Sequence, residues 1–188
     1  MIITVSESAG IKCQVGDFNL LIDSPSGKKG NLILKTHTEM PVNSFSSQSI
    51  IYGPGEYEIS GVRVRGVLLP EDSSDKVLRS MYTAQLEGMR LAFFLDISAN
   101  PSEDSLDRLG EIDILFISVD TKELNPKQIT ALIKQIDPSI IIPTTDKTAK
   151  MLSEEMGQKV KAEEKLVIKR KDLVKEDIAN KLVWLKTK

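Results

Sequence analysis

The chain of 188 residues contains one histidine, His37, and one cysteine, Cys13. A single cysteine excludes an internal disulfide and a zinc site of the CxxC kind. Zinc centres of the multi-histidine type need several imidazole ligands, so one histidine excludes such a centre. No GxSxG motif is present, and the histidine has no evident serine partner. The sequence therefore gives no support for a serine hydrolase.

Strong charge of one sign and long apolar runs are also lacking. The net charge is −2, which gives no electrostatic reason to expect nucleic acid or an anionic membrane as a partner. The apolar runs are too short to span a bilayer, and the first residues lack the features of a signal peptide. Hydrophobic residues make up 40% and charged residues 28% of the chain, an ordinary globular composition. We expect a cytoplasmic protein with one domain over residues 1–188.

The first half of the chain is rich in β-strand signals. Short apolar or alternating segments occur at residues 2–5, 11–15 and 18–22. Gly16-Asp17, between the last two segments, is typical of a two-residue hairpin turn. A second hairpin is predicted to turn at Glu87-Gly88. This half of the chain therefore predicts antiparallel strands.

Arg63 and Arg65 alternate with Val62 and Val64. A strict alternation of this kind predicts a strand with one buried face and one wet face. The two arginines give a modest basic face, which we interpret as solvated.

The second half changes to a helical period. Helices are predicted from Ser102 to Gly110, from Asn125 to residue 136, and over residues 147–157. Ser102 and Asn125 are N-cap residue types, and Pro126 suits the first helical position. The near-continuous apolar runs at residues 112–119 and 139–143 predict strands buried on both faces, and two closing strands are expected at 166–170 and 182–186. The order of elements predicts an α/β protein with sheets covered by helices.

Three stretches carry a resemblance to a known family: "IIYGPGEYEISGVRVRGV" from residue 50, "LGEIDILFISVD" from residue 109, and "IDPSIIIPTTDKT" from residue 136. At these stretches the chain resembles small bacterial proteins of the metallo-β-lactamase superfamily, a Zn-dependent-hydrolase-like group related to the ascorbate-phosphate lactonases. The resemblance extends along the whole chain. It implies a four-layer αβ/βα sandwich, with the active site at one edge where strand-ending loops meet.

The resemblance also implies where the metal ligands of that family would lie. His37 occupies the first histidine position and Asp96 the bridging aspartate position, so these two ligands are kept. The remaining ligand positions, in chain order, are occupied by Glu39, Pro41, Val42, Glu71 and Thr145. Proline and valine have no side-chain ligand atom, and Thr145 replaces the last histidine. The residual metal-ligand candidates are His37, Glu39, Glu71 and Asp96.

If Glu39, Glu71 and Asp96 converge, their carboxylates repel one another unless a proton or a cation intervenes. Three interpretations stay open. The side chains can be solvated on open loops and need no cation. The ammonium group of Lys35 or Lys147 can replace the metal. An oxygen-preferring ion, Mg²⁺, Mn²⁺ or Ca²⁺, can bind instead.

The leading functional hypothesis is a degenerate, non-catalytic member of the family with a binding or assembly role and no cofactor. One alternative is a metal-dependent hydrolase of an ester, lactone or phosphoester that uses a rebuilt, oxygen-rich site. Another is a structural subunit of an oligomer, because strand-rich domains often pair through edges or exposed sheet faces. No particular partner or substrate follows from the sequence.

Overall fold

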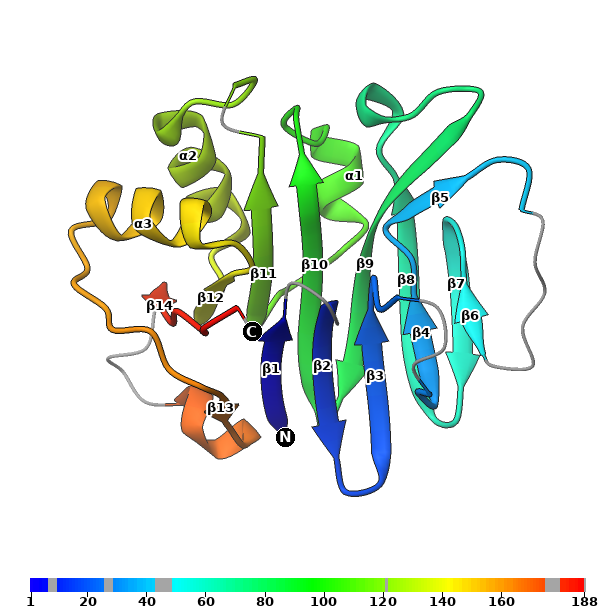
Figure 1. Ribbon diagram of the computed structural model, residues 1–188, viewed down its shortest axis with the longest axis horizontal. Helices are drawn as coiled ribbons and strands as arrows, with labels where there is room; N and C mark the ends of the chain where they lie inside the picture. Colours follow the sequence, from blue (N-terminus) through cyan, green and yellow to red (C-terminus); the bar gives the residue numbers. More distant parts are fainter. Residues whose placement is uncertain (7–9, 26–28, 43–48, 121, 175–179, 188) are drawn as a thin grey trace.

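Two β-sheets face each other in the computed structural model, which describes residues 1–6, 10–25, 29–42, 49–120, 122–174 and 180–187 (Figure 1). The six-stranded sheet has the order β13 (Leu166–Val167), β1 (Ile2–Ser6), β2 (Gly10–Val15), β3 (Phe18–Ile22), β4 (Leu32–Leu34), β6 (Ile50–Ile51). Its strands from β13 to β3 are antiparallel, and β3, β4 and β6 are parallel.

The eight-stranded sheet has the order β14 (Lys181–Leu182), β12 (Ile140–Pro143), β11 (Ile114–Val119), β10 (Met89–Ile97), β9 (Val77–Leu86), β8 (Val62–Leu68), β7 (Gly55–Ile59). The eighth strand, β5 (His37–Glu39), is not part of this order and pairs with the first residues of β9. Strands β10, β11, β12 and β14 are parallel, whereas β7 to β10 form an antiparallel meander.

The α-helices within the described ranges are α1 (Glu103–Asp107), α2 (Pro126–Ile136) and α3 (Asp146–Glu155), and the short 3-10 helices there are η1 (Pro70–Asp72) and η2 (Arg170–Val174). All three α-helices lie against the outer face of the eight-stranded sheet, where they share one apolar cluster with its strands (Figure 1). The predicted α/β class is confirmed. Within the described ranges, the layers are sheet, sheet and helices, and no α-helix covers the six-stranded sheet.

The helices begin where the capping signals predict. The Ser102 side chain accepts a hydrogen bond from the Ser105 amide, and Asn125 and Gln128 form a reciprocal capping box at the start of α2. α3 begins at Asp146, one residue before the predicted start, because Thr145 serves as its N-cap. Capping residues therefore fix the places where the chain leaves the sheet.

The apolar interior lies between the two sheets. Phe93 of β10 and Phe116 of β11 are fully buried there and stack with ring centroids 4.8 Å apart. All six residues of β11 are buried, which confirms the predicted strand with two covered faces. Cys13 is also fully buried, and burial raises the pKa of its thiol far above the ordinary value. This cysteine is therefore a packed side chain with little thiolate at neutral pH.

Both predicted hairpin turns are present. β2 ends at Val15 and β3 begins at Phe18, so Gly16-Asp17 is the turn between them. Glu87 and Gly88 both have positive φ, +50° and +72°, as a type I′ turn requires.

None of the helices in the described part of the chain is long and apolar enough to cross a membrane.

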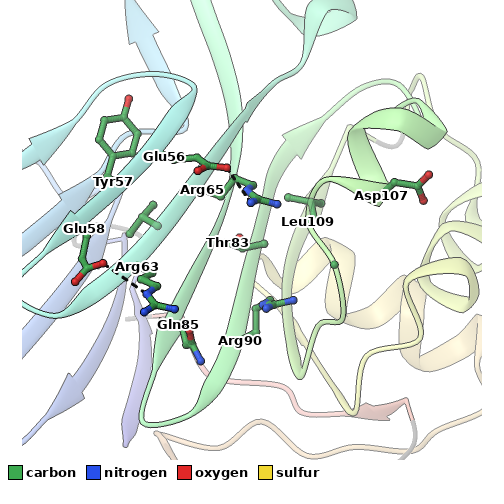
Figure 2. A pocket seen from close by; sticks show the side chains of 12 residues that line it. Glu56, Tyr57, Glu58, Arg63, Arg65, Thr83, Gln85, Arg90, Asp107 and Leu109 are labelled. Carbon is green, nitrogen blue, oxygen red and sulfur yellow. Dashed lines mark ion pairs between the residues drawn. The ribbon is translucent and has the colours of Figure 1, made fainter.

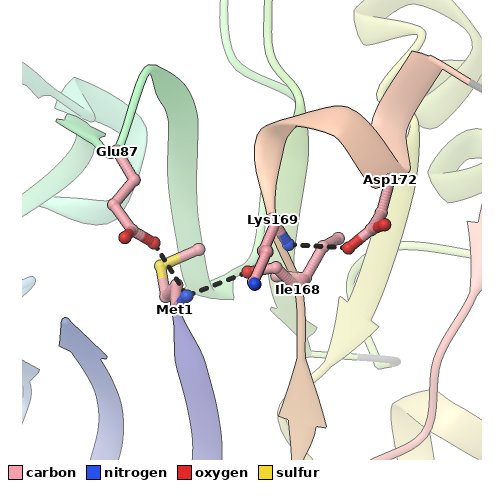
Figure 3. Close-up of polar contacts among 5 residues, drawn as sticks. All are labelled: Met1, Glu87, Ile168, Lys169 and Asp172. Atoms are coloured by element: carbon pink, nitrogen blue, oxygen red, sulfur yellow. Dashed lines mark hydrogen bonds and ion pairs between the residues drawn. The ribbon is translucent and has the colours of Figure 1, made fainter. Parts of the chain in front are cut away.

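The closing strands are shorter than predicted. β13 and β14 have two residues each, although the sequence predicts strands at 166–170 and 182–186. After Ile168 the chain turns into η2, and the Asp172 carboxylate accepts a hydrogen bond from the Lys169 amide at 2.9 Å (Figure 3). This local side-chain bond competes with continued strand pairing.

The first residue joins three parts of the fold. The amino group of Met1 donates to Glu87 Oε2 at 2.7 Å and to the Ile168 carbonyl oxygen at 2.9 Å (Figure 3). Glu87 lies in the β9–β10 turn, and Ile168 follows β13. The start of β1 is thus tied to both sheets by charge as well as by packing.

Candidate functional site

A polar cleft of about 600 Å³ opens where β10 and β11 end beside η1. We call it the edge cleft. It is lined by Glu71, Asp72, Ser73, Ser74, Arg79, Asp96, Ser98, Val119 and Asp120. Because β10 and β11 are parallel, their carboxyl ends meet at one edge of the sheet, which is where open α/β sheets place ligands. The edge cleft is therefore the first place to look for chemistry.

Asp96 lies in the cleft at an irregularity of β10. The pairing of β10 with β11 shifts register between Phe94 and Ile97, and Asp96 has a φ of +52°. Its amide donates to Ser118 Oγ at 2.8 Å, and Ser118 Oγ donates to Asp96 Oδ1 at 2.9 Å. A left-handed conformation at a non-glycine residue costs about 1–3 kcal/mol and persists where the surroundings hold it. Ser118 thus fixes the exposed Asp96 carboxylate at the cleft.

Asp72 is held against the end of β10 from the other side. Both of its carboxylate oxygens accept from the Ser98 amide at 3.3 Å, and the Ser98 hydroxyl also donates to Oδ1. Asp72 ends η1, the short helix that carries Glu71. The hydrogen bonds at Ser98 therefore set the position of η1 relative to Asp96.

Arg79 brings a positive charge into this acidic cleft. It lies near the start of β9, and its amide donates to Ser73 Oγ at 3.0 Å. Among the residues that the structure describes, no carboxylate lies within ion-pair distance of the Arg79 guanidinium. Arg79 nevertheless lines the same cleft as Glu71, Asp96 and Asp120. Sequence reasoning missed Arg79, because its place in the cleft depends on which strands pair.

His37 and Glu39 do not line the edge cleft, although His37 is the cross-strand neighbour of Arg79. They lie on β5, and Thr38 between them is buried, with its hydroxyl donating to the Tyr52 carbonyl oxygen at 2.8 Å. Side chains alternate along a strand, so His37 and Glu39 point away from that buried side. Both are exposed, and neither is among the described residues that line the edge cleft. The structure therefore joins Glu71 and Asp96 in one cleft, with His37 next to it, opposite Arg79, and Glu39 farther along β5, opposite Val77.

The residues at the other lost ligand positions, and Lys147, do not line the edge cleft either. Pro41 is exposed and Val42 half-buried after β5. The Thr145 hydroxyl caps α3, accepting from the Thr148 amide at 3.2 Å and donating to the Thr148 hydroxyl at 2.9 Å. Lys147 is exposed in the first turn of α3. None of these four predicted residues is among the residues known to line the edge cleft.

Asp23, which sequence reasoning did not select, lies close to the cleft. Its carboxylate accepts from the Thr36 amide at 2.8 Å and from the Thr36 hydroxyl at 2.5 Å. Burial raises the pKa of Asp23 above its ordinary value, the Thr36 bonds and the charge of Lys35 lower it, and the charge of Asp96 raises it. Lys35 itself donates to the Ser24 carbonyl oxygen at 2.5 Å. The charge of Lys35 therefore acts on Asp23.

The ligand atoms of the edge cleft differ from those of the zinc site that the resemblance implies. Zinc of the family's kind is held by neutral imidazoles and a carboxylate. The edge cleft instead offers carboxylates, hydroxyls and one guanidinium. In the described part of the chain, no three His, Cys, Asp or Glu side chains lie close enough together to hold a metal ion. The residues present do not fit zinc bound in the family's manner.

Comparison with known proteins gives one family match. A family model described as "Beta-lactamase superfamily domain" matches residues 19–145, more than half of the chain. Among curated proteins, none matches the chain by sequence. The matched range begins in β3 and ends at Thr145, so it includes every residue of the edge cleft.

Several solved structures share the fold. A protein named as a Zn-dependent hydrolase of the metallo-beta-lactamase superfamily from Thermotoga maritima is 16% identical, with a TM-score of 0.70 over 100% of this chain and 99% of that chain. The metallo-beta-lactamase fold protein YhfI from Bacillus subtilis is 8% identical, with a TM-score of 0.59 over 99% and 96%. The metallo hydrolase Igni18 from Ignicoccus hospitalis is 12% identical, with a TM-score of 0.60 over 89% and 99%. At these identities the likeness shows the fold alone.

Proposed function

The chain belongs to the beta-lactamase superfamily, and from this premise we propose that it is a degenerate member, without the zinc histidines, that has a binding or assembly role and no hydrolytic one. The metallo-β-lactamase-like fold predicted from the sequence is confirmed. The closer relation to ascorbate-phosphate lactonases stays a prediction, as do a bacterial origin and a cytoplasmic location.

The observation that carries the proposal is the arginine in the edge cleft. Arg79 lines the cleft together with Glu71 and Asp96, the two predicted ligand positions that the structure brings together. A guanidinium is charged at all ordinary pH values, so it offsets the repulsion of the carboxylates without a metal. The same charge repels a divalent cation. We therefore interpret Arg79 as the cation of the cleft, in place of Lys35 or Lys147, which the sequence left open as possible replacements for a metal.

Thermal melting tests this proposal. The protein is treated with EDTA and then melted with Zn²⁺, Mn²⁺ or Mg²⁺ added in turn. An ion present at about 100 times its dissociation constant would stabilise the fold by about 2.7 kcal/mol. For a chain of this size that is a rise in Tm of roughly 5–10 °C. We expect no saturable rise with any of the three ions.

The control for this experiment is a pair of matched variants. Asp96→Asn removes a carboxylate of the edge cleft, and Asp17→Asn removes an exposed carboxylate at the β2–β3 turn. A saturable stabilisation that Asp96→Asn abolishes and Asp17→Asn retains would contradict the non-catalytic proposal. It would favour the alternative described next.

The first alternative is a hydrolase of an ester, lactone or phosphoester with an oxygen-rich metal site. The observation in its favour is that Glu71, Asp72, Asp96 and Asp120 line one cleft. Their carboxylates would have to move closer together to hold an ion, because no three such side chains in the described part of the chain lie close enough as they stand. Such ligands suit Mg²⁺, Mn²⁺ or Ca²⁺. Turnover of small ester, lactone and phosphoester substrates with added Mn²⁺, lost in Asp96→Asn, would establish this alternative over the leading proposal.

The second alternative is a structural subunit of an oligomer. Ile2 and Val167 are cross-strand neighbours in the six-stranded sheet, with 38% and 58% of their surface exposed. An exposed apolar pair on a sheet is a feature of interfaces. Light scattering would show a multiple of the chain mass for the wild type and the single-chain mass for Val167→Glu.

A further inference from the structure

A second hollow, of about 540 Å³, lies on the outer face of β7 to β10, beside the end of α1 (Figure 2). We call it the outer groove and define its floor by Arg63, Arg65, Thr83, Gln85 and Arg90. Helices cover the rest of this face, where Phe94, Ile117 and other apolar residues pack against them. The outer groove is the polar part of a face that is elsewhere apolar.

The strand register places the arginines in rows. Arg63 of β8 lies opposite Gln85 of β9, and Gln85 lies opposite Arg90 of β10. Arg65 lies opposite Thr83 in the next row on the same face. Directly opposed residues have Cβ atoms about 4.5–5.5 Å apart, so Arg63 and Arg90 lie on either side of Gln85. Figure 2 shows the three guanidinium groups around the side chains of Thr83 and Gln85.

Two of these guanidinium groups are held by backbone oxygens. Arg65 Nη1 donates to the Arg108 carbonyl oxygen at 2.5 Å, and Arg90 Nη1 donates to the Glu111 carbonyl oxygen at 3.2 Å. A Cβ atom at Gly110 would lie 2.5 Å from Arg90 Nη1, so this glycine leaves space for the guanidinium. A guanidinium has five N–H donors; the bond to the backbone uses one donor of each arginine, and Arg65 Nη2 also pairs with Glu56 at 2.8 Å. The remaining donors can bind a ligand without first losing much side-chain freedom.

The choice of basic residue also points to oxyanion recognition. The chain has 19 lysines and 6 arginines, and the residues known to line the outer groove include three arginines and no lysine. Simple solvation would not select arginine over the more numerous lysine. Guanidinium groups form paired hydrogen bonds with phosphate and carboxylate oxygens, which an ammonium group cannot do in the same geometry.

Acidic residues form the rim of the outer groove. Glu58 pairs with Arg63 at 3.5 Å and Glu56 with Arg65 at 2.8 Å, while Asp107 lies on the side of α1. The Arg63 and Glu58 side chains are 75% and 66% exposed. Exposed pairs of this kind contribute little stability, so an entering anion can replace the carboxylate. The rim also repels a long polyanion, which would have to pass over these acids.

We propose that the outer groove binds a small ligand through a phosphoryl group, held between Arg63 and Arg90 with Gln85 beneath it and Arg65 beside it. The hollow is within the usual size range of small-molecule sites, roughly 300–1,000 Å³. The acidic rim favours a compact phosphorylated molecule over a nucleic acid. This site goes beyond the proposed function, because it does not depend on whether the edge cleft binds a metal.

Isothermal titration calorimetry tests the proposal with the full chain, sodium pyrophosphate as the probe, low ionic strength and EDTA present. We expect saturable binding to the wild type. Arg63→Gln and Arg90→Gln should each weaken it by about tenfold or more, because each removes a charge-assisted hydrogen bond. Arg90→Lys, which keeps the charge and loses the paired donors, should lie between the wild type and Arg90→Gln.

The matched control is Lys134→Gln, which removes one exposed positive charge from α2. It should leave pyrophosphate binding unchanged, and the melting temperatures of all variants should confirm that they fold. Absence of saturable binding in the wild type would overturn the proposal. Equal weakening by Lys134→Gln would also overturn it. So would loss of pyrophosphate binding in Arg79→Gln with binding retained in Arg63→Gln and Arg90→Gln, because Arg79 lines the edge cleft. Tighter binding of a single-stranded oligonucleotide than of pyrophosphate would overturn it as well. Inorganic phosphate and a small organic phosphate, titrated separately, would distinguish the source of the phosphoryl group.

Discussion

The edge cleft and the outer groove lie on the same sheet and have opposite constructions. In the edge cleft, strand β10 is irregular at Asp96, and four acidic residues and Arg79 are among the residues that line the hollow. In the outer groove the strands pair regularly, arginines occupy the floor, and carboxylates form the rim. Ligand residues at strand ends can be exchanged without disturbing the core. Residues on a strand face are fixed by alternation, so the groove depends on the sheet itself.

The largest effect is expected where the cleft depends on one buried hydroxyl. Ser118 is 3% exposed and exchanges two hydrogen bonds with Asp96. Ser118→Ala leaves the Asp96 amide without its partner, so the free energy of unfolding should fall by about 1–3 kcal/mol in urea denaturation. Ser24→Ala is the matched control, because the described residues offer the buried Ser24 hydroxyl no partner. Equal losses in both variants would show that the cleft needs no such support.

A second test uses the titration of Asp23 near the cleft. Burial raises the pKa of this carboxyl, so the folded state holds the proton to higher pH than the unfolded state. Its contribution to stability is therefore complete at pH values below the ordinary aspartate pKa of about 3.9 and is lost as the pH rises through the folded value. Asp23→Asn has no such titration. Urea denaturation at a series of pH values should show the wild type losing stability relative to Asp23→Asn as pH rises, and a constant difference would contradict the assignment.

A third test removes the charge that distinguishes the cleft from a metal site. Arg79→Gln leaves the carboxylates of Glu71 and Asp96 without the guanidinium. We expect Mn²⁺ at a few times its dissociation constant to stabilise this variant by about 1 kcal/mol, measured by thermal melting. Arg170→Gln, whose side chain pairs with Asp113 away from the cleft, serves as the control. An unchanged response to Mn²⁺ in Arg79→Gln would show that the arginine is not what excludes the ion.

The smallest effect is expected in the outer groove. Arg63→Gln breaks an exposed ion pair with Glu58, so the free energy of unfolding should stay within about 0.5 kcal/mol of the wild type. Urea denaturation measures this. A large loss of unfolding free energy would mean that Arg63 stabilises the fold. The two hollows would then differ less in what their charged residues do.

Local signals in the sequence predicted much of the fold. The caps at Ser102 and Asn125 and the turns at Gly16 and Glu87 depend only on neighbouring residues, and the structure has them where predicted. The first closing strand, β13, is shorter than predicted because the Asp172 carboxylate accepts a hydrogen bond from the Lys169 amide just after it. Local signals were therefore enough to predict most helices, strands and turns.

The sites depended on pairing that no local signal contains. Arg79 reaches the edge cleft because of the register at the start of β9, where it lies opposite His37 of β5. Arg63 and Arg90 are 27 positions apart in the sequence and become neighbours of Gln85 only through two strand pairings. The sequence placed Arg63 on a wet face but did not show the hollow above it. The direction of a side chain could be predicted from the alternation along its strand, but the side chains that lie next to it on other strands could not.

In the function we propose, Arg79 has taken the place of the metal in a beta-lactamase superfamily fold. The most direct test is elemental analysis of protein purified without added metal, for the wild type and for Asp96→Asn. We expect no stoichiometric metal in either protein. A stoichiometric metal in the wild type that disappears in Asp96→Asn would contradict it.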